Sequence, residues 1–217
     1  MNAAHSTRIE RLFLDGPAGR LEALLEWVPH TPLRRAALVC HPHPLYGGTL
    51  HTKVVFRAAK AALSLGFPTL RFNFRGVGKS EGAYGHEIGE RDDARAALDA
   101  LAARFPSLPV VMMGFSFGSV VGLAVGAADA RVSALVGMGV PVASSDLGFL
   151  RPVSKPKLIV QGTADLYGPR ERLQEFLASL AEPKRIRWVE GADHFFTGRL
   201  DELQSAIREF LEAEVLA

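Results

Sequence analysis

The chain has 217 residues, 48% of them apolar and 22% charged, and its 25 Lys and Arg nearly balance its 23 Asp and Glu. A chain of this length and composition buries most of its apolar surface in one core, so we expect a single domain over residues 1–217 and exclude a disordered, coiled-coil or collagen-like chain. Because the basic residues are scattered along the chain, we expect no nucleic-acid partner.

Charged residues also interrupt the apolar segments that could direct the protein to secretion or into a membrane. Arg8, Glu10, Arg11 and Asp15 interrupt the apolar residues near the N-terminus, and this leaves no apolar core of the kind found in secretory signals. The best candidate for a membrane-spanning run, residues 120–128, is far shorter than the roughly 20 apolar residues that a span requires. We therefore predict a cytoplasmic protein that does not bind a membrane.

The first elements expected along the chain are strands. Two short apolar segments within residues 8–27 flank a turn-forming sequence at residues 15–19, which predicts a β-hairpin or a pair of edge strands. The continuous apolar run Ala36–Cys40 is typical of a strand buried on both faces of a parallel sheet. Cys40 is the only cysteine, so it cannot form an internal disulfide, and we expect it to be buried in this strand.

Helices and strands alternate through the rest of the chain. Apolar spacing predicts helices at residues 53–65, 87–104, 119–127, 169–180 and 200–213, and strands at residues 68–74, 110–113, 132–138, 157–160 and 185–189. Gly66 follows the first of these helices, where a glycine commonly ends a helix. Such alternation predicts an α/β fold, with helices on both faces of a mostly parallel sheet and ligands bound beyond the carboxyl ends of the strands.

The clearest chemical motif is Gly114-Phe115-Ser116-Phe117-Gly118, which matches the pattern G-x-S-x-G. In this pattern a serine occupies a strained turn between a strand and a helix, and glycines are needed because side chains at the flanking positions would crowd the turn. The context fits, because the apolar residues 110–113 lead into Gly114 and a helical pattern follows Ser116. We predict that Ser116 is a nucleophile.

A serine hydroxyl needs a base within hydrogen-bond reach, and the base needs a partner that fixes its tautomer. Asp165 and His194 each follow a predicted strand closely, so both are expected at the sheet edge that carries Ser116. The chain order Ser, Asp, His is the one associated with this type of turn. We predict His194 as the base and Asp165 as the orienting acid, with Asp146 and Asp193 as rivals of Asp165.

Other histidines compete with His194, namely His41, His43, His51 and His86, but His194 alone follows a late strand. In an extended segment His41 and His43 would share one face, as paired metal ligands do. No third ligand with suitable spacing accompanies them. We therefore expect no metal ion and no other cofactor.

Five motifs together resemble the α/β-hydrolase family, and the resemblance covers nearly the whole chain. They are His41-Pro42-His43-Pro44-Leu45-Tyr46-Gly47-Gly48, Phe72-Asn73-Phe74-Arg75-Gly76-Val77-Gly78-Lys79-Ser80, the Ser116 turn, Gly162-Thr163-Ala164-Asp165 and Gly191-Ala192-Asp193-His194. The chain is most similar to small bacterial serine hydrolases that have no lid and are related to dienelactone hydrolases. It differs from true dienelactone hydrolases in having a serine where their cysteine nucleophile stands.

The resemblance implies an oxyanion hole made of two main-chain N–H groups. Phe117 is expected to provide one, and the loop after the third strand is expected to provide the other. Pro42 and Pro44 have no N–H, which leaves His43 or Leu45, and we favour Leu45. The residues expected to line the substrate pocket are His43, Tyr46 and Tyr84.

Many members of this family insert a lid after the sixth strand. Here residues 139–156 are all that separates two predicted core strands, too little for a helical lid. An open site favours a small-molecule ester substrate, so we predict an esterase that cleaves small carboxylic esters through an acyl-serine intermediate. A serine peptidase, thioesterase or acyltransferase on the same triad, or a non-catalytic binding module, remains an alternative. The sequence leaves open whether the protein is a monomer or a homodimer.

Overall fold

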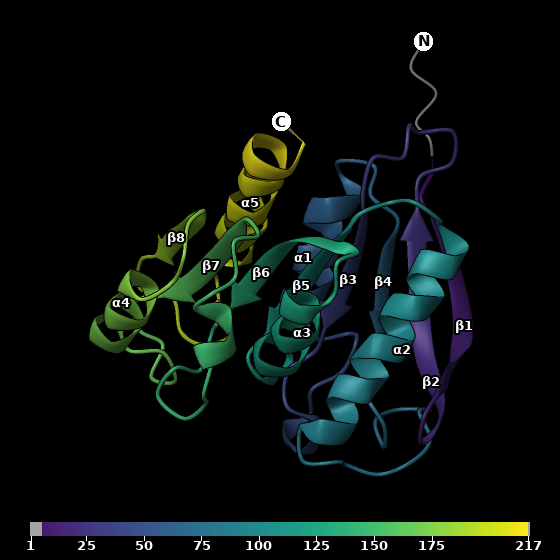
Figure 1. The fold of residues 1–217 in the computed structure, drawn as a ribbon, viewed down its shortest axis with the longest axis horizontal. Helices are drawn as coiled ribbons and strands as arrows, with labels where there is room; N and C mark the ends of the chain where they lie inside the picture. Colours follow the sequence, from purple (N-terminus) through teal and green to yellow (C-terminus); the bar gives the residue numbers. More distant parts are fainter. Residues whose placement is uncertain (1–5, 217) are drawn as a thin grey trace.

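The computed structural model describes residues 6–216, which form one eight-stranded sheet flanked by helices (Figure 1). The strands are β1 (Arg8–Gly16), β2 (Gly19–Trp27), β3 (Ala36–Cys40), β4 (Thr69–Phe72), β5 (Val110–Phe115), β6 (Val132–Met138), β7 (Lys157–Gly162) and β8 (Lys184–Val189). The helices are α1 (Lys53–Leu63), α2 (Ile88–Arg104), α3 (Phe117–Ala128), α4 (Arg170–Ala178) and α5 (Leu200–Phe210). Short helical turns occur at η1 (Pro44–Tyr46), η2 (Gly148–Leu150) and η3 (Leu211–Val215).

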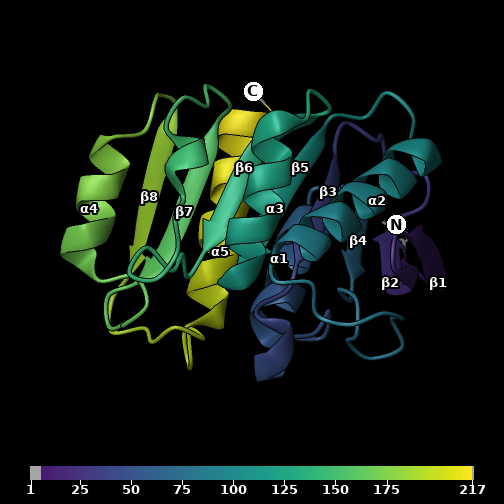
Figure 2. The same cartoon turned by 60° about the horizontal axis from the view of Figure 1, so that its bottom comes forward.

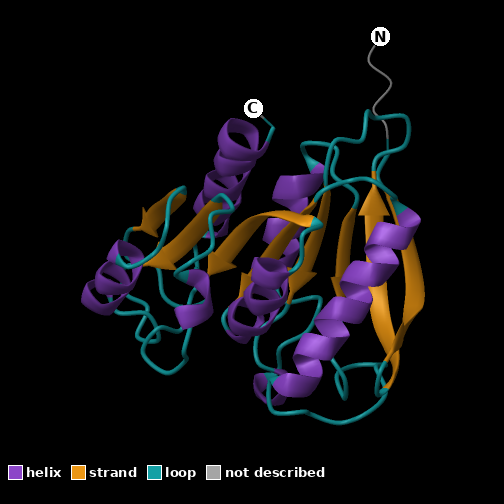
Figure 3. Cartoon of the chain, viewed as in Figure 1, coloured by secondary structure: helices purple, strands orange, loops and turns teal. Residues whose placement is uncertain are grey.

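The order of the strands in the sheet is β1-β2-β4-β3-β5-β6-β7-β8. β1 and β2 form the predicted hairpin, and β2 also pairs with β4 in antiparallel fashion, so β1 alone of the two lies at the sheet edge. All other pairs are parallel, as Figure 3 shows. The prediction of a mostly parallel α/β sheet is confirmed.

Helices cover both faces of the sheet (Figure 2). On one face α1 and α5 pack against a cluster of buried residues that includes Val111 and Met113. On the other face α2, α3 and α4 enclose a second cluster, which includes Val110 and Met112. Alternate residues of β5 thus enter opposite cores, which explains why the sequence of this central strand is apolar without interruption. Cys40 is fully buried in β3, as predicted.

The element boundaries differ from the predictions by a few residues. α1 ends at Leu63, two residues before the predicted end, and Gly66 takes up a left-handed conformation (φ 79°) in the turn that follows. α3 begins at Phe117 rather than at residue 119, because Ser116 alone makes the turn from β5. The last helix is regular only to Phe210 and continues as the π-helical turn η3.

The connection between β6 and β7 contains a single short helical turn, η2, among its residues, all of which the structure describes. The fold is therefore a single α/β domain in which no lid covers the carboxyl ends of these strands. No helix within residues 6–216 is long and apolar enough to cross a membrane.

Candidate active site

Ser116 occupies a strained turn between β5 and α3. Its backbone angles are φ 53° and ψ −121°, a region that residues with a side chain rarely adopt. The two glycines of the motif make the turn possible: a Cβ on Gly114 would lie 2.2 Å from the carbonyl oxygen of Gly118, and a Cβ on Gly118 would lie 2.4 Å from that of Cys40. The local sequence thus forces the Ser116 hydroxyl away from the sheet.

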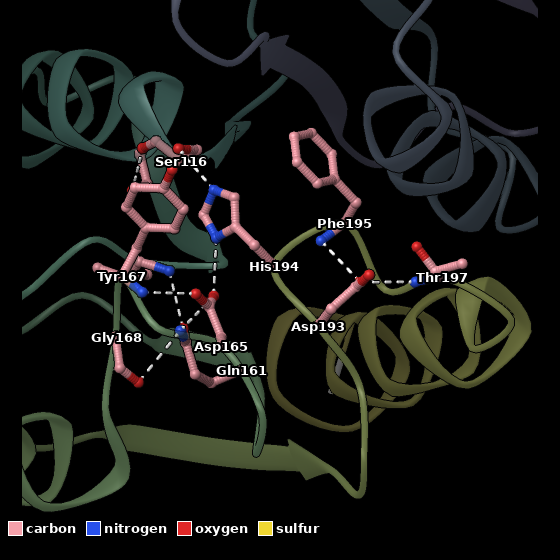
Figure 4. A network of polar contacts seen from close by, with 11 residues as sticks. Ser116, Gln161, Asp165, Tyr167, Gly168, Asp193, His194, Phe195 and Thr197 are labelled. Carbon is pink, nitrogen blue, oxygen red and sulfur yellow. Dashed lines mark hydrogen bonds and ion pairs between the residues drawn. The ribbon is translucent and has the colours of Figure 1, made fainter.

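The structure brings together the three side chains predicted to form a triad (Figure 4). His194 Nε2 lies 2.9 Å from Ser116 Oγ, and His194 Nδ1 lies 2.8 Å from Asp165 Oδ2. A carboxylate only accepts hydrogen bonds, so His194 donates its Nδ1–H to Asp165 and leaves the Nε2 lone pair to accept the Ser116 hydroxyl proton. This is the arrangement that a serine needs to become a nucleophile.

Two further groups fix the carboxylate of Asp165, which is 3% exposed. Gln161 Nε2 donates to Oδ2 over 2.8 Å, and the Tyr167 main-chain N–H donates to Oδ1 over 2.9 Å. Gln161 is itself held, because its Oε1 accepts the N–H of Val140. Sequence reasoning missed Gln161, since the strand that carries it was expected to end at residue 160, two residues before its observed end, and none of the five family motifs includes it.

The rivals of Asp165 have other roles. Asp193 caps its own loop: its carboxylate accepts hydrogen bonds from the main-chain N–H groups of Phe195 and Thr197, and the bond from the Thr197 N–H is the largest cause of its lowered pKa. Asp146 is exposed and accepts the N–H of Gly148. The hydrogen bonds of both rivals go to main-chain N–H groups of their own loops, whereas Asp165 accepts one from His194.

Ser116 and His194 open into a cavity of about 310 Å³. Most of its lining is apolar and includes several aromatic rings. The lining residues are Pro42, His43, Tyr46, Gly47, Gly48, Thr52, Glu87, Ser116, Phe117, Pro141, Ser144, Ser145, Tyr167, His194 and Phe195. His43 and Tyr46 are thus placed as expected, whereas Tyr84 lies behind the wall, with its ring packed against His43 and Phe117.

The structure changes the preferred second oxyanion donor. Phe117 is the first residue of α3, so its N–H has no acceptor within the helix and is free for an oxyanion beside Ser116. The N–H of Leu45, which we favoured as the second donor, instead donates to His43 Nδ1 over 3.2 Å. The alternative, the N–H of His43, takes its place as the candidate donor.

His43 is held in one tautomer by the same contact. Because its Nδ1 accepts the Leu45 N–H, the ring proton lies on Nε2, which faces Tyr84 Oη at 3.3 Å. Partial burial lowers the pKa of His43, although the carboxylates of Glu90 and Glu87 act in the opposite direction. The ring at this wall of the cavity is therefore neutral near pH 7.

His41 does not pair with His43 at a metal site. It is fully buried beneath the loop, donates Nδ1–H to the Pro42 carbonyl and accepts the Phe74 N–H at Nε2. His41 therefore ties the loop after β3 to the loop after β4. Within residues 6–216 no three His, Cys, Asp or Glu side chains are grouped so that they could hold a metal ion.

Burial makes His41 a source of pH-dependent stability. Desolvation lowers its pKa to about 4 in the folded protein, against 6.5 for an ordinary histidine. Between these values the unfolded chain binds the proton and the folded protein does not, so stability is lost as the pH falls. We expect His41 to account for a loss of about 2 kcal/mol of unfolding free energy between about pH 7 and about pH 5.

Urea denaturation of the wild type and of His41→Gln at both pH values measures this contribution, because the other groups cancel in the comparison. The variant should be less stable near neutral pH, and its loss on acidification should be smaller by about 2 kcal/mol. Equal pH dependence in the two proteins would contradict the burial of a neutral imidazole at this position.

Comparisons of the sequence and of the structure with known proteins point to the same family. A sequence model described as an alpha/beta hydrolase domain matches residues 46–213. The structure is similar to that of a protein from Xanthomonas campestris described as an α/β serine hydrolase without a lid, with a TM-score of 0.88, 33% identity and coverage of 97% of both chains.

Two further relatives cover almost the same length. An α/β serine hydrolase homologue from Coxiella burnetii is 38% identical and superimposes with a TM-score of 0.87, covering 93% of this chain and 97% of that one. An uncharacterised protein from Rickettsia prowazekii is 33% identical over 212 residues, which is 93% of this chain and 88% of the relative. The similarity therefore extends over the whole fold rather than over the Ser116 turn alone.

Proposed function

Because the chain belongs to the α/β-hydrolase family, we propose that it is a serine esterase that hydrolyses small carboxylic esters through an acyl-serine intermediate. The observation that carries this proposal is the continuous chain of hydrogen bonds from Asp165 through His194 to Ser116, at the base of an open cavity. A serine, a neutral imidazole and a buried carboxylate in this order are the groups that acyl transfer requires.

In the first half of the reaction Ser116 Oγ attacks the ester carbonyl carbon while His194 Nε2 takes the hydroxyl proton. The tetrahedral oxyanion accepts hydrogen bonds from the N–H groups of Phe117 and His43. Collapse of this intermediate breaks the bond to the alcohol oxygen, and His194 returns the proton to the departing alcohol. The products of this half are the free alcohol and an acyl group on Ser116.

In the second half of the reaction, water takes the part that Ser116 Oγ has in the first half. His194 takes a proton from the water as its oxygen attacks the acyl carbon, and the same two N–H groups bind the second oxyanion. The proton returns to Ser116 Oγ when the acyl bond breaks, which releases the carboxylic acid. Asp165 keeps its charge throughout and stabilises the imidazolium that forms twice in each cycle.

The shape of the site favours small esters. The connection between β6 and β7 adds no helical cover, and the rings of Tyr46, Tyr167 and Phe195 stand exposed at the cavity rim. A long acyl chain would leave the cavity of about 310 Å³ and remain in water, so added methylene groups gain little binding free energy.

We expect the kcat/KM of the wild type to be no greater for p-nitrophenyl octanoate than for the acetate and butyrate esters, whereas a site that buried the longer acyl chain would show an increase with each added methylene group. The physical reason is that apolar surface outside the cavity is not removed from water. Release of p-nitrophenol measures the rates, with the uncatalysed hydrolysis of each ester as the control. Faster turnover of octanoate than of acetate would contradict the proposed preference for small substrates.

Labelling distinguishes the proposed esterase from a non-catalytic binding module on the same scaffold. A fluorophosphonate probe should react with Ser116 in the folded protein and leave a phosphonylated peptide that mass spectrometry identifies. A protein that is folded but not labelled would favour the binding module. Amide, thioester and acyl-acceptor substrates then separate the peptidase, thioesterase and acyltransferase alternatives, which pass through a similar oxyanion.

A further inference from the structure

One residue that lines the cavity at Ser116, Glu87, is acidic and has no part in the proposed reaction, and its charge acts on the His43 ring at the cavity wall by opposing the fall in pKa that burial causes there. Among the described residues that line the cavity, Glu87 is the only aspartate, glutamate, lysine or arginine. Glu87 pairs with Arg91, whose Nη2 lies 3.7 Å from Glu87 Oε2, and the two side chains are 41% and 37% exposed. A pair this long and this exposed contributes little, so the negative charge of Glu87 remains available to a ligand.

The backbone that places Glu87 at the cavity is in a strained conformation. His86 (φ 52°) and Glu87 (φ 69°) are consecutive residues in the left-handed region, although both carry side chains. Strain of this kind persists where the surroundings enforce it, and it is concentrated at functional sites. Glu90, which is fully buried, enforces it from below by accepting the Gly85 N–H over 2.7 Å, and the Glu87 carbonyl accepts the Arg91 N–H at the start of α2.

Aromatic rings make up much of the remaining wall. Tyr46, Tyr167 and Phe195 lie at the rim, and Phe117 lies beside Ser116. The faces of such rings attract cations, and they also accommodate the methyl groups of a quaternary ammonium. No Lys or Arg is among the described lining residues, so a substrate carboxylate would meet Glu87 with no counter-ion.

From this combination we propose that Glu87 is a specificity-determining residue. It selects esters that bear a positive charge near the scissile bond, in the form of a protonated amine or a quaternary ammonium. The inference rests on the proposed esterase function and adds the substrate class. Glu87 supplies the counter-charge, the rings supply the apolar contact, and the neutral His43 ring adds no positive charge to repel the substrate.

A matched pair of substrates tests this role. Acetylcholine and 3,3-dimethylbutyl acetate have the same shape, but a carbon replaces the charged nitrogen in the second. Their intrinsic reactivities differ, so the informative quantity is the ratio of their kcat/KM values and how this ratio changes between proteins. We expect Glu87→Gln to lower the ratio about threefold to fivefold relative to the wild type, the upper part of the range for a partly exposed ion pair, because the substitution removes the carboxylate and leaves the aromatic rings in place.

The matched control is Asp92→Asn, which removes one negative charge from the same helix outside the cavity. It should leave the acetylcholine preference of the wild type unaltered, and added salt should reduce that preference because it screens the attraction. A ratio that is the same in Glu87→Gln and in the wild type would overturn the proposal, even if both esters are hydrolysed well.

Binding to Ser116→Ala separates this proposal from the esterase proposal. Calorimetric titration of Ser116→Ala with the two uncleaved esters should give tighter binding of acetylcholine, and Ser116→Ala/Glu87→Gln should lose about threefold to fivefold of that preference. If the wild type hydrolyses no ester while this binding preference is found, the esterase proposal fails and the cation site stands. If the esters are hydrolysed but bound without preference for the cation, the cation site fails and the esterase stands.

Discussion

Ser116→Ala should lower kcat for p-nitrophenyl acetate at least about 10⁴-fold. The substitution removes the oxygen that forms the acyl intermediate, and water would have to replace it without the positioning of the strained turn. The residual rate should still exceed that of the uncatalysed reaction, because the variant keeps the two proposed oxyanion donors, the N–H groups of Phe117 and His43. Steady-state release of p-nitrophenol, with a fluorophosphonate label as a second readout, measures both effects.

Ser205→Ala is the control for this experiment. Ser205 is exposed on α5, outside the residues that line the cavity, so its loss should leave both the rate and the labelling at the wild-type level. Circular dichroism of Ser116→Ala should match that of the wild type, because alanine fits wherever the serine side chain does. A folded Ser116→Ala protein that retains more than about one per cent of the activity would require another nucleophile.

Much of the fold was predictable because local patterns report burial. The apolar runs of β3 and β5 and the helical spacing of α1 identify elements whose side chains enter a core, and all eight strands and five helices were anticipated. The order of the strands in the sheet was not predicted, because the pairing of β2 with β4 and of β3 with β5 depends on contacts between distant parts of the chain. The one- to three-residue errors at element ends have a similar origin.

The meeting of the three residues proposed as a triad was predictable for a simpler reason. Ser116, Asp165 and His194 each follow closely on a strand of the parallel part of the sheet, so the parallel sheet alone brings them to one edge. The choice between His43 and Leu45 was not accessible in this way. It depends on whether the His43 side chain turns back onto the Leu45 N–H, and no spacing in the sequence reports a rotamer.

Gln161 and Glu87 were missed because their placement depends on unusual local geometry. Gln161 lies in an extension of β7 beyond the apolar run, where its amide reaches both Val140 and Asp165. Glu87 reaches the cavity through left-handed backbone angles, which the residue types at His86 and Glu87 do not favour. In both cases the conformation depends on the surrounding structure rather than on the residue types in the segment itself.

Asp165→Asn should lower kcat by about 10³- to 10⁴-fold, because the Asp165 side chain acts only as an acceptor in its hydrogen bonds and an asparagine amide cannot replace it fully. Oδ2 accepts from His194 and Gln161, and Oδ1 accepts from the Tyr167 N–H. An asparagine has one amide group that donates, so in either orientation an N–H group faces another donor. If it faces His194, the imidazole must accept at Nδ1 and carry its proton on Nε2, where it can no longer take the proton of Ser116.

Asp193→Asn is the matched comparison, since it makes the same chemical change at the residue next to His194. Asp193 caps the loop through the Phe195 and Thr197 N–H groups, and the asparagine side-chain oxygen can still accept these bonds. The loss of kcat should therefore stay below about tenfold, and a modest drop in thermal stability is the main effect expected. Kinetics of both variants with p-nitrophenyl acetate measure the difference, which should be at least about 100-fold. A greater loss in Asp193→Asn than in Asp165→Asn would assign the orienting role to Asp193, and the hydrogen bond from His194 to Asp165 would then have no part in the reaction.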